Sequence, residues 1–242
     1  GLAQRPYEGA CSALAAPDSA ALRSATVVAN SRWTADVVEE RYGVDAETVY
    51  PPVDDAEFPD RTWAEREDGF LTIGRIGPSK RVLENVNVVE RLRERGHDVH
   101  LHVVGPTTDD DYSRRVERAA AAREFVSLEG AVDRGTLVDL VATHRYGLHG
   151  RPYEHFGIAV AELVAGGTVT FAPDSGGQRE VLGDDDRLLY DSTDEAVEQI
   201  DRVLSDPSLQ RSLRDRLDAV SPAPDPEGFR ERVSGIVDRV LA

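Results

Sequence analysis

Residues 151–162 read RPYEHFGIAVAE, and the interpretation of the whole chain starts from this stretch. It holds two carboxylates, Glu154 and Glu162, eight positions apart, and the apolar run after Gly157 is typical of a buried helix. A helix beginning near Phe156 would direct its unpaired N–H groups at whatever precedes it. These groups and the helix dipole favour an anion, above all phosphate. The alternative is a buried helix with two incidental acidic residues.

The separation of the two carboxylates limits what they can do together. Glu162 would lie about 12 Å from Glu154 if the whole span were helical. A glycosidase acid pair needs roughly 5 to 9.5 Å, so the spacing argues against glycoside hydrolysis. It suits two acids that hold hydroxyl groups at different places on one long ligand. A nucleotide-sugar is such a ligand, because it has sugar hydroxyls at one end, ribose hydroxyls at the other and a diphosphate between them.

Strands and helices alternate around this stretch, at least five times over residues 69 to about 221. That order predicts an α/β fold, a Rossmann-like doubly wound and mainly parallel sheet that is covered on both faces. Such sheets bind ligands at the carboxyl ends of their strands. Residues 74–80, 149–157 and 174–177 each follow a predicted strand. We therefore expect these three segments to converge on one site for an anionic ligand.

Residues 74–80 have the composition of a phosphate-binding loop. A buried strand over residues 70–74 runs into a loop that carries Arg75 and Lys80, and a helix is predicted from about residue 79 to 95. This arrangement suits phosphate, although the P-loop pattern is absent. Lys80 is the only lysine in the chain, which suggests that an ammonium group is needed there. The alternative is a pair of solvent-exposed cations.

Histidines and aspartates offer further candidate ligands. His149 ends a predicted strand just before the central stretch, so it is a candidate sugar contact, with a purely structural histidine as the alternative. His100 and His102 alternate along another strand, but no third ligand follows at usable spacing, so we predict no metal site there. Three aspartates at 109–111 are interpreted as the cap of a helix and not as a metal-binding motif.

The charge of the chain excludes several classes of partner. Its 242 residues carry a formal net charge of −17, which argues against nucleic acid and against attraction to anionic lipid. Abundant acid with a single lysine is typical of halophilic proteins. No apolar run approaches the ~20 residues of a membrane-spanning helix. The lone cysteine, Cys11, excludes an internal disulfide and fits a reducing compartment, so we expect a cytoplasmic location.

The stretch EHFGIAVAE at 154–162, with YGLH at 146–149, resembles the E-x7-E region of the family-4 retaining glycosyltransferases, and in particular their ALG11-like mannosyltransferase branch. The resemblance covers nearly all of residues 25 to 240. It implies the GT-B fold, of which this chain would supply the C-terminal, donor-binding domain. The expected fold class is therefore a GT-B C-terminal domain with a partial N-terminal βαβ segment.

The resemblance also implies a role for each candidate residue. Arg75 and Lys80 would stabilise charge that develops on the departing diphosphate, and Glu154 would hold the transferred sugar. These three are the predicted catalytic residues. The other predicted donor-binding residues are His149, Phe156, Gly157, Ile158 and Glu162, the last of which would hold the ribose. No metal ion and no other cofactor is expected, because side-chain cations take the place of a metal.

The predicted domain organisation has its boundary in an acidic connector at residues 54–68. We predict that residues 1–57 end an N-terminal acceptor domain and that residues 69–242 form the donor-binding domain with three C-terminal helices. In the family the last helix packs back towards the N-terminal domain. Because the acceptor domain would be incomplete, we expect the chain alone to bind donors weakly and to transfer little sugar.

The implied reaction is transfer of a hexosyl group from a GDP- or UDP-linked sugar to a glycan or lipid-linked acceptor, with retention. The mannosyltransferase resemblance favours GDP-mannose. A lipid-linked acceptor would place the intact enzyme at the cytoplasmic face of a membrane as a peripheral protein. Two alternatives stay open, a non-catalytic nucleotide-sugar-binding module and a nucleotide-sugar epimerase. A phosphorylase is disfavoured, because Lys80 lies in the wrong context for a pyridoxal-phosphate lysine.

Overall fold

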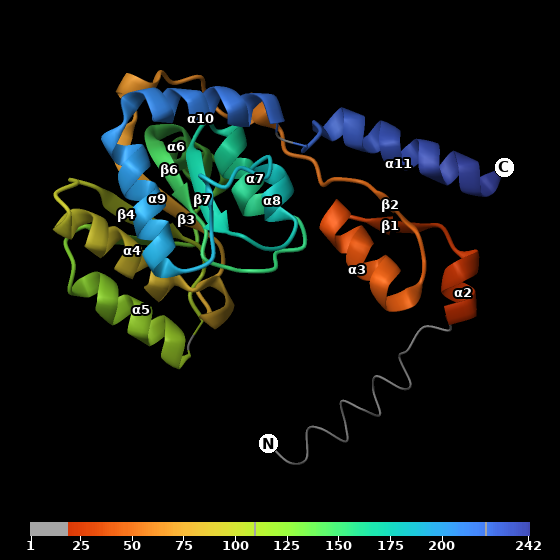
Figure 1. Ribbon diagram of the computed structural model, residues 1–242, viewed down its shortest axis with the longest axis horizontal. Coiled ribbons are helices and arrows are strands. Elements are labelled where there is room, and N and C mark those ends of the chain that lie inside the picture. The colour runs from red at the N-terminus through yellow and green to blue at the C-terminus, as the bar shows by residue number, and fades with distance from the viewer. Residues whose placement is uncertain (1–18, 109, 221) are drawn as a thin grey trace, which may run out of the picture.

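A six-stranded parallel sheet forms the centre of the computed structural model, which describes residues 19–108, 110–220 and 222–242 (Figure 1). The strands are β3 (Glu67–Ile73), β4 (His100–Val104), β5 (Val126–Gly130), β6 (His144–Leu148), β7 (Val169–Pro173) and β8 (Leu189–Tyr190). They lie in the order β5-β4-β3-β6-β7-β8, and each neighbouring pair is parallel. The predicted parallel α/β sheet is confirmed.

Helices connect the strands and cover both faces of the sheet (Figure 1). They are α4 (Val82–Glu94), α5 (Asp111–Ala121), α6 (Arg134–Thr143), α7 (Ile158–Ala165), α8 (Gln178–Val181), α9 (Thr193–Ser205) and α10 (Pro207–Val220). Phe70 and Val103 belong to one hydrophobic cluster, whereas their neighbours Leu71 and Val104 belong to a second one. Successive residues of a strand point to opposite faces, so a packed core lies on each side of the sheet.

Two helices begin later than predicted, and the backbone gives the reason. The helix expected from residue 79 starts at α4, because a 3-10 turn η3 (Pro78–Lys80) precedes it and Arg81 has a φ of 52°. The helix expected from Phe156 starts at Ile158, because Gly157 has a φ of 99°. The cap at the start of α5 is confirmed for Asp110, which accepts from Ser113 N at 2.7 Å. Asp109 lies outside the described residues.

A smaller unit precedes the sheet. It consists of α2 (Ser19–Ser24), β1 (Val27–Ala29), α3 (Arg32–Tyr42) and β2 (Ala46–Thr48), with β1 and β2 paired in parallel. Ser31 caps α3 by accepting from Thr34 N at 3.0 Å, and Gly43 ends it with a φ of 62°. The predicted βαβ segment is therefore present. A connector with the short turns η1 (Asp55–Glu57) and η2 (Trp63–Glu65) leads from it to β3.

The last helix, α11 (Pro226–Leu241), lies beside this smaller unit and not on the six-stranded sheet (Figure 1). Arg232 Nη2 lies 2.6 Å from Glu47 Oε1, and Arg239 Nη2 lies 2.5 Å from Glu47 Oε2. Exposed ion pairs of this kind contribute little stability, but the two arginines hold α11 against β2. Across the described ranges, no helix combines the length and the apolar character needed to cross a membrane.

The strand order creates a switch point between β3 and β6. The chain leaves β3 for β4 on one side, and it leaves β6 for β7 on the other side. Connections that diverge in this way leave a crevice at the carboxyl ends of the two strands, where open α/β sheets bind ligands. Two of the three predicted site segments, residues 74–80 and 149–157, follow β3 and β6 and therefore flank this crevice.

Candidate functional site

The switch point brings together Lys80 and Glu154, which are 74 residues apart in the chain. Lys80 Nζ donates to Glu154 Oε1 at 2.5 Å, and the two side chains are only 18% and 15% exposed. Lys80 ends η3 directly after β3, and Gly74 gives it room, because a Cβ at Gly74 would lie 3.0 Å from Lys80 Cε. The single lysine of the chain is thus a half-buried ammonium held by a carboxylate.

Two further side chains, an imidazole and a guanidinium, approach the same carboxylate oxygen. His149 Nε2 lies 3.2 Å from Glu154 Oε1, and Arg151 Nε lies 3.8 Å from it. The backbone of Glu154 is fixed as well, because it forms a β-bridge with Gly176 and its carbonyl accepts from Gly177 N at 2.8 Å. The loops after β3, β6 and β7 therefore meet at Glu154.

His149 is fixed in position but keeps one ring nitrogen for a ligand. Its backbone N donates to Phe171 O at 2.9 Å, and its carbonyl accepts from Tyr190 OH at 2.6 Å. The side chain is buried, and Nε2 makes no hydrogen bond of regular geometry with any described residue, although it lies near Glu154. Its nearest polar neighbour is Glu154 Oε1 at 3.2 Å, so a bound hydroxyl near this carboxylate could share the nitrogen with Glu154.

The environment of Glu154 keeps its carboxylate ionised. Burial is the largest influence on the pKa of Glu154 and raises it, but the His149 ring and the Lys80 ammonium together outweigh burial and hold the pKa at about 2. Burial lowers the pKa of His149, so its imidazole stays neutral at pH 7. The site at neutral pH is therefore an ammonium, a carboxylate and a neutral imidazole.

Acid is expected to destabilise the chain through these two groups. Glu154 has a pKa depressed from 4.5 to about 2, so its contribution to stability is present above pH 4.5 and is lost as pH falls towards 2. The depressed pKa of His149 adds a loss below pH 6.5. The pKa shift of Glu154 corresponds to at most about 3 kcal/mol of unfolding free energy. Glu154→Gln should lack this contribution at pH 7, and its unfolding free energy should therefore fall less between pH 5 and 2.5 than that of the unaltered chain.

Urea unfolding at a series of pH values would measure this difference. Glu124→Gln is the matched control, since Glu124 is exposed and follows α5. Equal acid sensitivity in Glu154→Gln and Glu124→Gln would contradict the assignment.

The other predicted residues occupy different surroundings. Arg75 is exposed, and neither an ion pair nor a hydrogen bond links it to Glu154. Phe156 is buried and packs on Tyr50, with ring centroids 5.8 Å apart. Gly157 caps α7, and Ile158, its first residue, is 52% exposed. The unpaired N–H groups of α7 therefore begin at Ile158 and not at Phe156.

Glu162, one turn into α7, already has a partner. Its Oε1 accepts from Arg134 Nη1, and Arg134 Nη2 also lies 2.5 Å from Glu57 Oε2 in the connector. Within the described ranges, Glu162 Oε2 accepts no hydrogen bond. The structure therefore does not bring Glu162 into contact with Glu154, and it leaves one of the two oxygens for a ligand.

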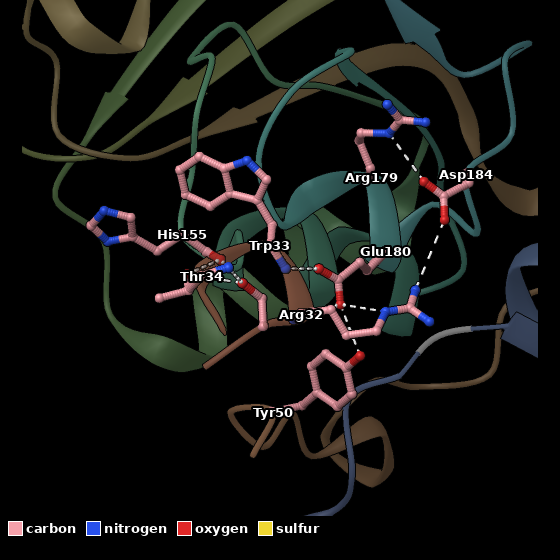
Figure 2. Close-up of polar contacts among 9 residues, drawn as sticks. Arg32, Trp33, Thr34, Tyr50, His155, Arg179, Glu180 and Asp184 are labelled. Atoms are coloured by element: carbon pink, nitrogen blue, oxygen red, sulfur yellow. Dashed lines mark hydrogen bonds and ion pairs between the residues drawn. The ribbon is translucent and has the colours of Figure 1, made fainter. Parts of the chain in front are cut away.

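Glu180, which sequence reasoning did not single out, joins the smaller unit to the sheet (Figure 2). Its Oε1 accepts from Trp33 N at 2.8 Å, and its Oε2 accepts from Arg32 N at 3.1 Å and from Tyr50 OH at 2.8 Å. Glu180 thus caps the N-terminus of α3 from α8, and it is 8% exposed. Burial and this hydrogen bond raise the pKa of Tyr50 to about 12.

The loop that carries Glu154 also contacts α3 (Figure 2). The carbonyl of His155 accepts from Ser31 Oγ and, at 3.1 Å, from Thr34 Oγ1. The His155 ring stacks on Trp33 with centroids 6.1 Å apart. The smaller unit therefore rests directly on the site.

Two hollows lie beside the loops that carry Glu154 and Ser175, although neither is lined by Lys80 or Glu154. One, of about 590 Å³, lies between α3 and α8, and Trp33 and Glu180 are among its lining residues. The other, of about 210 Å³, is lined in part by Asn85, Tyr153 and Tyr190. Gly176 lines the first and Ser175 the second.

Residues 53–218 match the family described as glycosyl transferases group 1. The chain belongs to this family. Curated relatives include two enzymes named GDP-Man:Man(3)GlcNAc(2)-PP-Dol alpha-1,2-mannosyltransferase. The one from Dictyostelium discoideum is 26% identical over 245 aligned residues, which cover 90% of this chain and 48% of the relative. The one from Mus musculus is 30% identical over 170 residues, covering 63% and 35%. This group 1 chain thus spans about half the length of these relatives or less.

Solved structures agree on the fold of the group 1 domain. The structure of Anabaena HepE in complex with UDP and glucose superposes with a TM-score of 0.76 at 15% identity, over 88% of this chain and 63% of that one. A glycosyltransferase from Rickettsia africae gives a TM-score of 0.75 at 17% identity, over 91% and 64%. The predicted family and fold class are confirmed, and the curated relatives named above are mannosyltransferases of the branch that the sequence resembles.

Proposed function

We propose that this chain is the donor-binding part of a retaining glycosyltransferase that transfers a mannosyl group from GDP-mannose to a lipid-linked glycan. The observation that carries the proposal is the buried Lys80–Glu154 pair, with His149 Nε2 3.2 Å from the same carboxylate oxygen. The pair lies at the switch point of a group 1 glycosyl transferase fold. The names of the curated relatives supply the choice of donor and acceptor.

Lys80 has enough hydrogen-bond donors to bind a diphosphate while it stays bonded to Glu154. An ammonium group carries three N–H donors, and Glu154 is the one acceptor that Lys80 has among the described residues. The remaining two N–H groups can point at phosphate oxygens. Arg75, exposed at the same loop, supplies a second cation, and the unpaired N–H groups that open α7 supply dipoles. These groups stabilise the negative charge of the departing nucleotide.

Glu154 and His149 hold the sugar in this proposal. The second oxygen of Glu154, Oε2, has no hydrogen bond from the residues in the described ranges and can accept from a sugar hydroxyl. The neutral His149 ring, whose Nε2 lies 3.2 Å from Glu154 Oε1, would share that nitrogen between the carboxylate and a sugar hydroxyl. Glu162 would accept from a ribose hydroxyl with the oxygen that Arg134 does not use.

The division of the chain follows the same proposal. Residues 69–242 form the donor domain, and residues 1–57 are the end of the acceptor domain. Contact between α3 and the loop of Glu154 supports this division, because it brings the smaller unit to the donor site. A lipid-linked acceptor would bring the working enzyme to the cytoplasmic face of a membrane. The charge of −17 would oppose general attraction to anionic lipid and fits a halophilic cytoplasm.

A panel of nucleotide-sugars tests the function. Melting temperatures are measured with GDP-mannose, GDP, UDP-glucose and ADP-glucose in high salt, which screens repulsion between the acidic chain and the ligands. We expect GDP-mannose to raise the melting temperature most. A chain that none of these ligands stabilises would contradict the proposal.

The role of Glu154 separates a transferase from a plain nucleotide-binding module. In Glu154→Gln we expect the stabilisation by GDP to persist and the extra stabilisation by GDP-mannose over GDP to disappear. Glu124→Gln, which alters an exposed carboxylate away from the site, should behave like the unaltered chain. An undiminished preference for GDP-mannose in Glu154→Gln would favour the binding-module alternative.

A further inference from the structure

Three histidines meet at the opposite end of the sheet from Lys80 and Glu154. His100 and His102 lie on β4, and His144 is the first residue of β6, with β3 between the two strands. One ligand atom from each of the three lies within 4.8 Å of the others. His100 Nε2 and His144 Nε2 are 3.3 Å apart. The three rings therefore form a single cluster.

The sheet geometry explains how the rings reach one another. His100 and His102 are two residues apart on a strand and so point to the same face. Gly69 of β3 is the register partner of His100, and a Cβ at Gly69 would overlap the His100 ring. Because Gly69 has no side chain, His100 crosses β3 and meets His144 on the next strand. A side chain at this position would separate the two histidines.

Hydrogen bonds at Nδ1 fix the tautomer of the His144 and His102 rings. His144 Nδ1 lies 2.7 Å from Leu140 O, and since a carbonyl only accepts, Nδ1 carries the proton and Nε2 keeps its lone pair. His102 Nδ1 lies 2.7 Å from the carboxylate of Glu129, which fixes the same tautomer. A histidine that donates one nitrogen to a carbonyl or carboxylate is the usual arrangement of a metal ligand.

We propose that His100, His102 and His144 bind a divalent transition-metal ion, Zn²⁺ foremost. Zn–N bonds of about 2.0–2.1 Å place two tetrahedral ligands about 3.3 Å apart, the separation of the His100 and His144 nitrogens. Imidazole ligands favour zinc and its neighbours over magnesium or calcium, which prefer oxygen. The site is half open, because the His100 and His102 side chains are 29% and 23% exposed.

A fourth ligand and charge balance are available beside the histidines. Glu67 Oε2 lies 3.4 Å from His100 Nε2 on the exposed side, so Glu67 or water completes four-coordination. Glu129 adds a second negative charge through His102. Two arginines oppose the bound cation, but Arg66 Nη1 donates to the carbonyls of Val141 and His144. Arg93 Nη1 donates to Asp98 and to the carbonyl of Val99.

The site is independent of the donor site and of the proposed function. His100 and His144 begin their strands, whereas the candidate donor site follows the strand ends, and five strand residues span roughly 16 Å. The bound ion therefore joins β4 and β6 across β3 as a structural cross-link. Sequence spacing alone missed it, because the third ligand lies 44 residues after His100 and reaches it only through the strand order.

A cobalt titration tests the proposal on the full chain after treatment with a chelator. Co²⁺ in a tetrahedral nitrogen site absorbs visible light much more strongly than octahedral Co²⁺ bound to surface carboxylates, so the acidic surface does not obscure the result. We expect one equivalent of Co²⁺ to give the tetrahedral band and Zn²⁺ to remove it by displacement. Absence of the band would overturn the proposal.

Variants assign the band to the cluster. His102→Gln should weaken Co²⁺ and Zn²⁺ binding at least tenfold, and Glu129→Gln, which leaves all three ligands in place, should weaken it about 10–100-fold. His97→Gln is the matched control, because His97 also contacts a carboxylate, Asp201 at 2.6 Å, but lies outside the cluster. Zn²⁺ should raise the melting temperature of the chain and of His97→Gln, and less so that of Glu129→Gln.

Folding of each variant is checked by circular dichroism before titration. If His102→Gln does not fold, Glu129→Gln decides the result, because it changes only an outer contact of one ring. If Glu129→Gln then bound the metal as tightly as His97→Gln does, the cluster would be a hydrogen-bonded histidine group only, and the proposal would be overturned.

Discussion

Replacing Lys80 with alanine is expected to weaken binding of GDP and GDP-mannose by about 10–100-fold. Hydrogen bonds to charged groups contribute roughly 1.5–3 kcal/mol, and tenfold in affinity corresponds to about 1.4 kcal/mol. The loss has two sources in this site. The phosphate loses its ammonium partner, and Glu154, 2.5 Å from Lys80 Nζ, becomes an uncompensated negative charge beside the ligand. Isothermal titration at constant ionic strength measures the effect.

Two controls separate the local effect from the global charge. Arg118→Ala removes one positive charge from exposed α5, so it matches the change in net charge without touching the site. The double variant Lys80→Ala with Glu154→Gln should bind GDP better than Lys80→Ala alone, because the uncompensated carboxylate is gone. If Lys80→Ala and Arg118→Ala bind GDP equally well, Lys80 does not contact the diphosphate.

Replacing Glu180 with alanine is expected to cost about 3 kcal/mol and to release α3 from the sheet. Removing one partner of a buried, hydrogen-bonded charge typically costs about 3–5 kcal/mol, and Arg32 remains partly solvated at 63% exposure, so the lower end applies. The carboxylate accepts from two backbone N–H groups of α3 and from Tyr50 OH (Figure 2). Hydrogen exchange should therefore speed up at Arg32 and Trp33 before it does in the six-stranded sheet.

Asp184→Asn is the matched control for Glu180→Ala. Asp184 also faces Arg32, but at 3.9 Å and with 50% of its side chain exposed, so its loss should cost less than about 1 kcal/mol. Urea midpoints and exchange of the α3 peptide compare the two variants. Equal midpoints would show that Glu180 does not hold the smaller unit in place.

The alternation of strands and helices was readable from the sequence because each strand of the sheet is a short apolar run between turn residues. The meeting of Lys80 and Glu154 followed from one further rule, that parallel strands present their carboxyl ends at the same edge. The first inference needs only the local pattern of apolar residues, and the second needs only the direction of the strands. The structure places the residues they single out at one end of β3 and β6.

Contacts that depend on the exact order of the strands could not be predicted from the sequence. His144 joins His100 only because β3 lies between their strands and carries Gly69 opposite His100. Glu180 reaches Trp33 N across 147 residues, and its only local signal was its place after two glycines. The late start of α4 depends on a left-handed Arg81, a conformation that no propensity favours for arginine.

The contacts of Glu180 and α11 bear on how the protein should be divided for experiments. The match to the family model covers residues 53–218. A recombinant fragment limited to residues 53–218 would lack all the α3 donors to Glu180, and it would lack both α11 and its partner Glu47. The segment that matches the family and the segment that folds together therefore differ in this molecule, and expression should retain the smaller unit and α11.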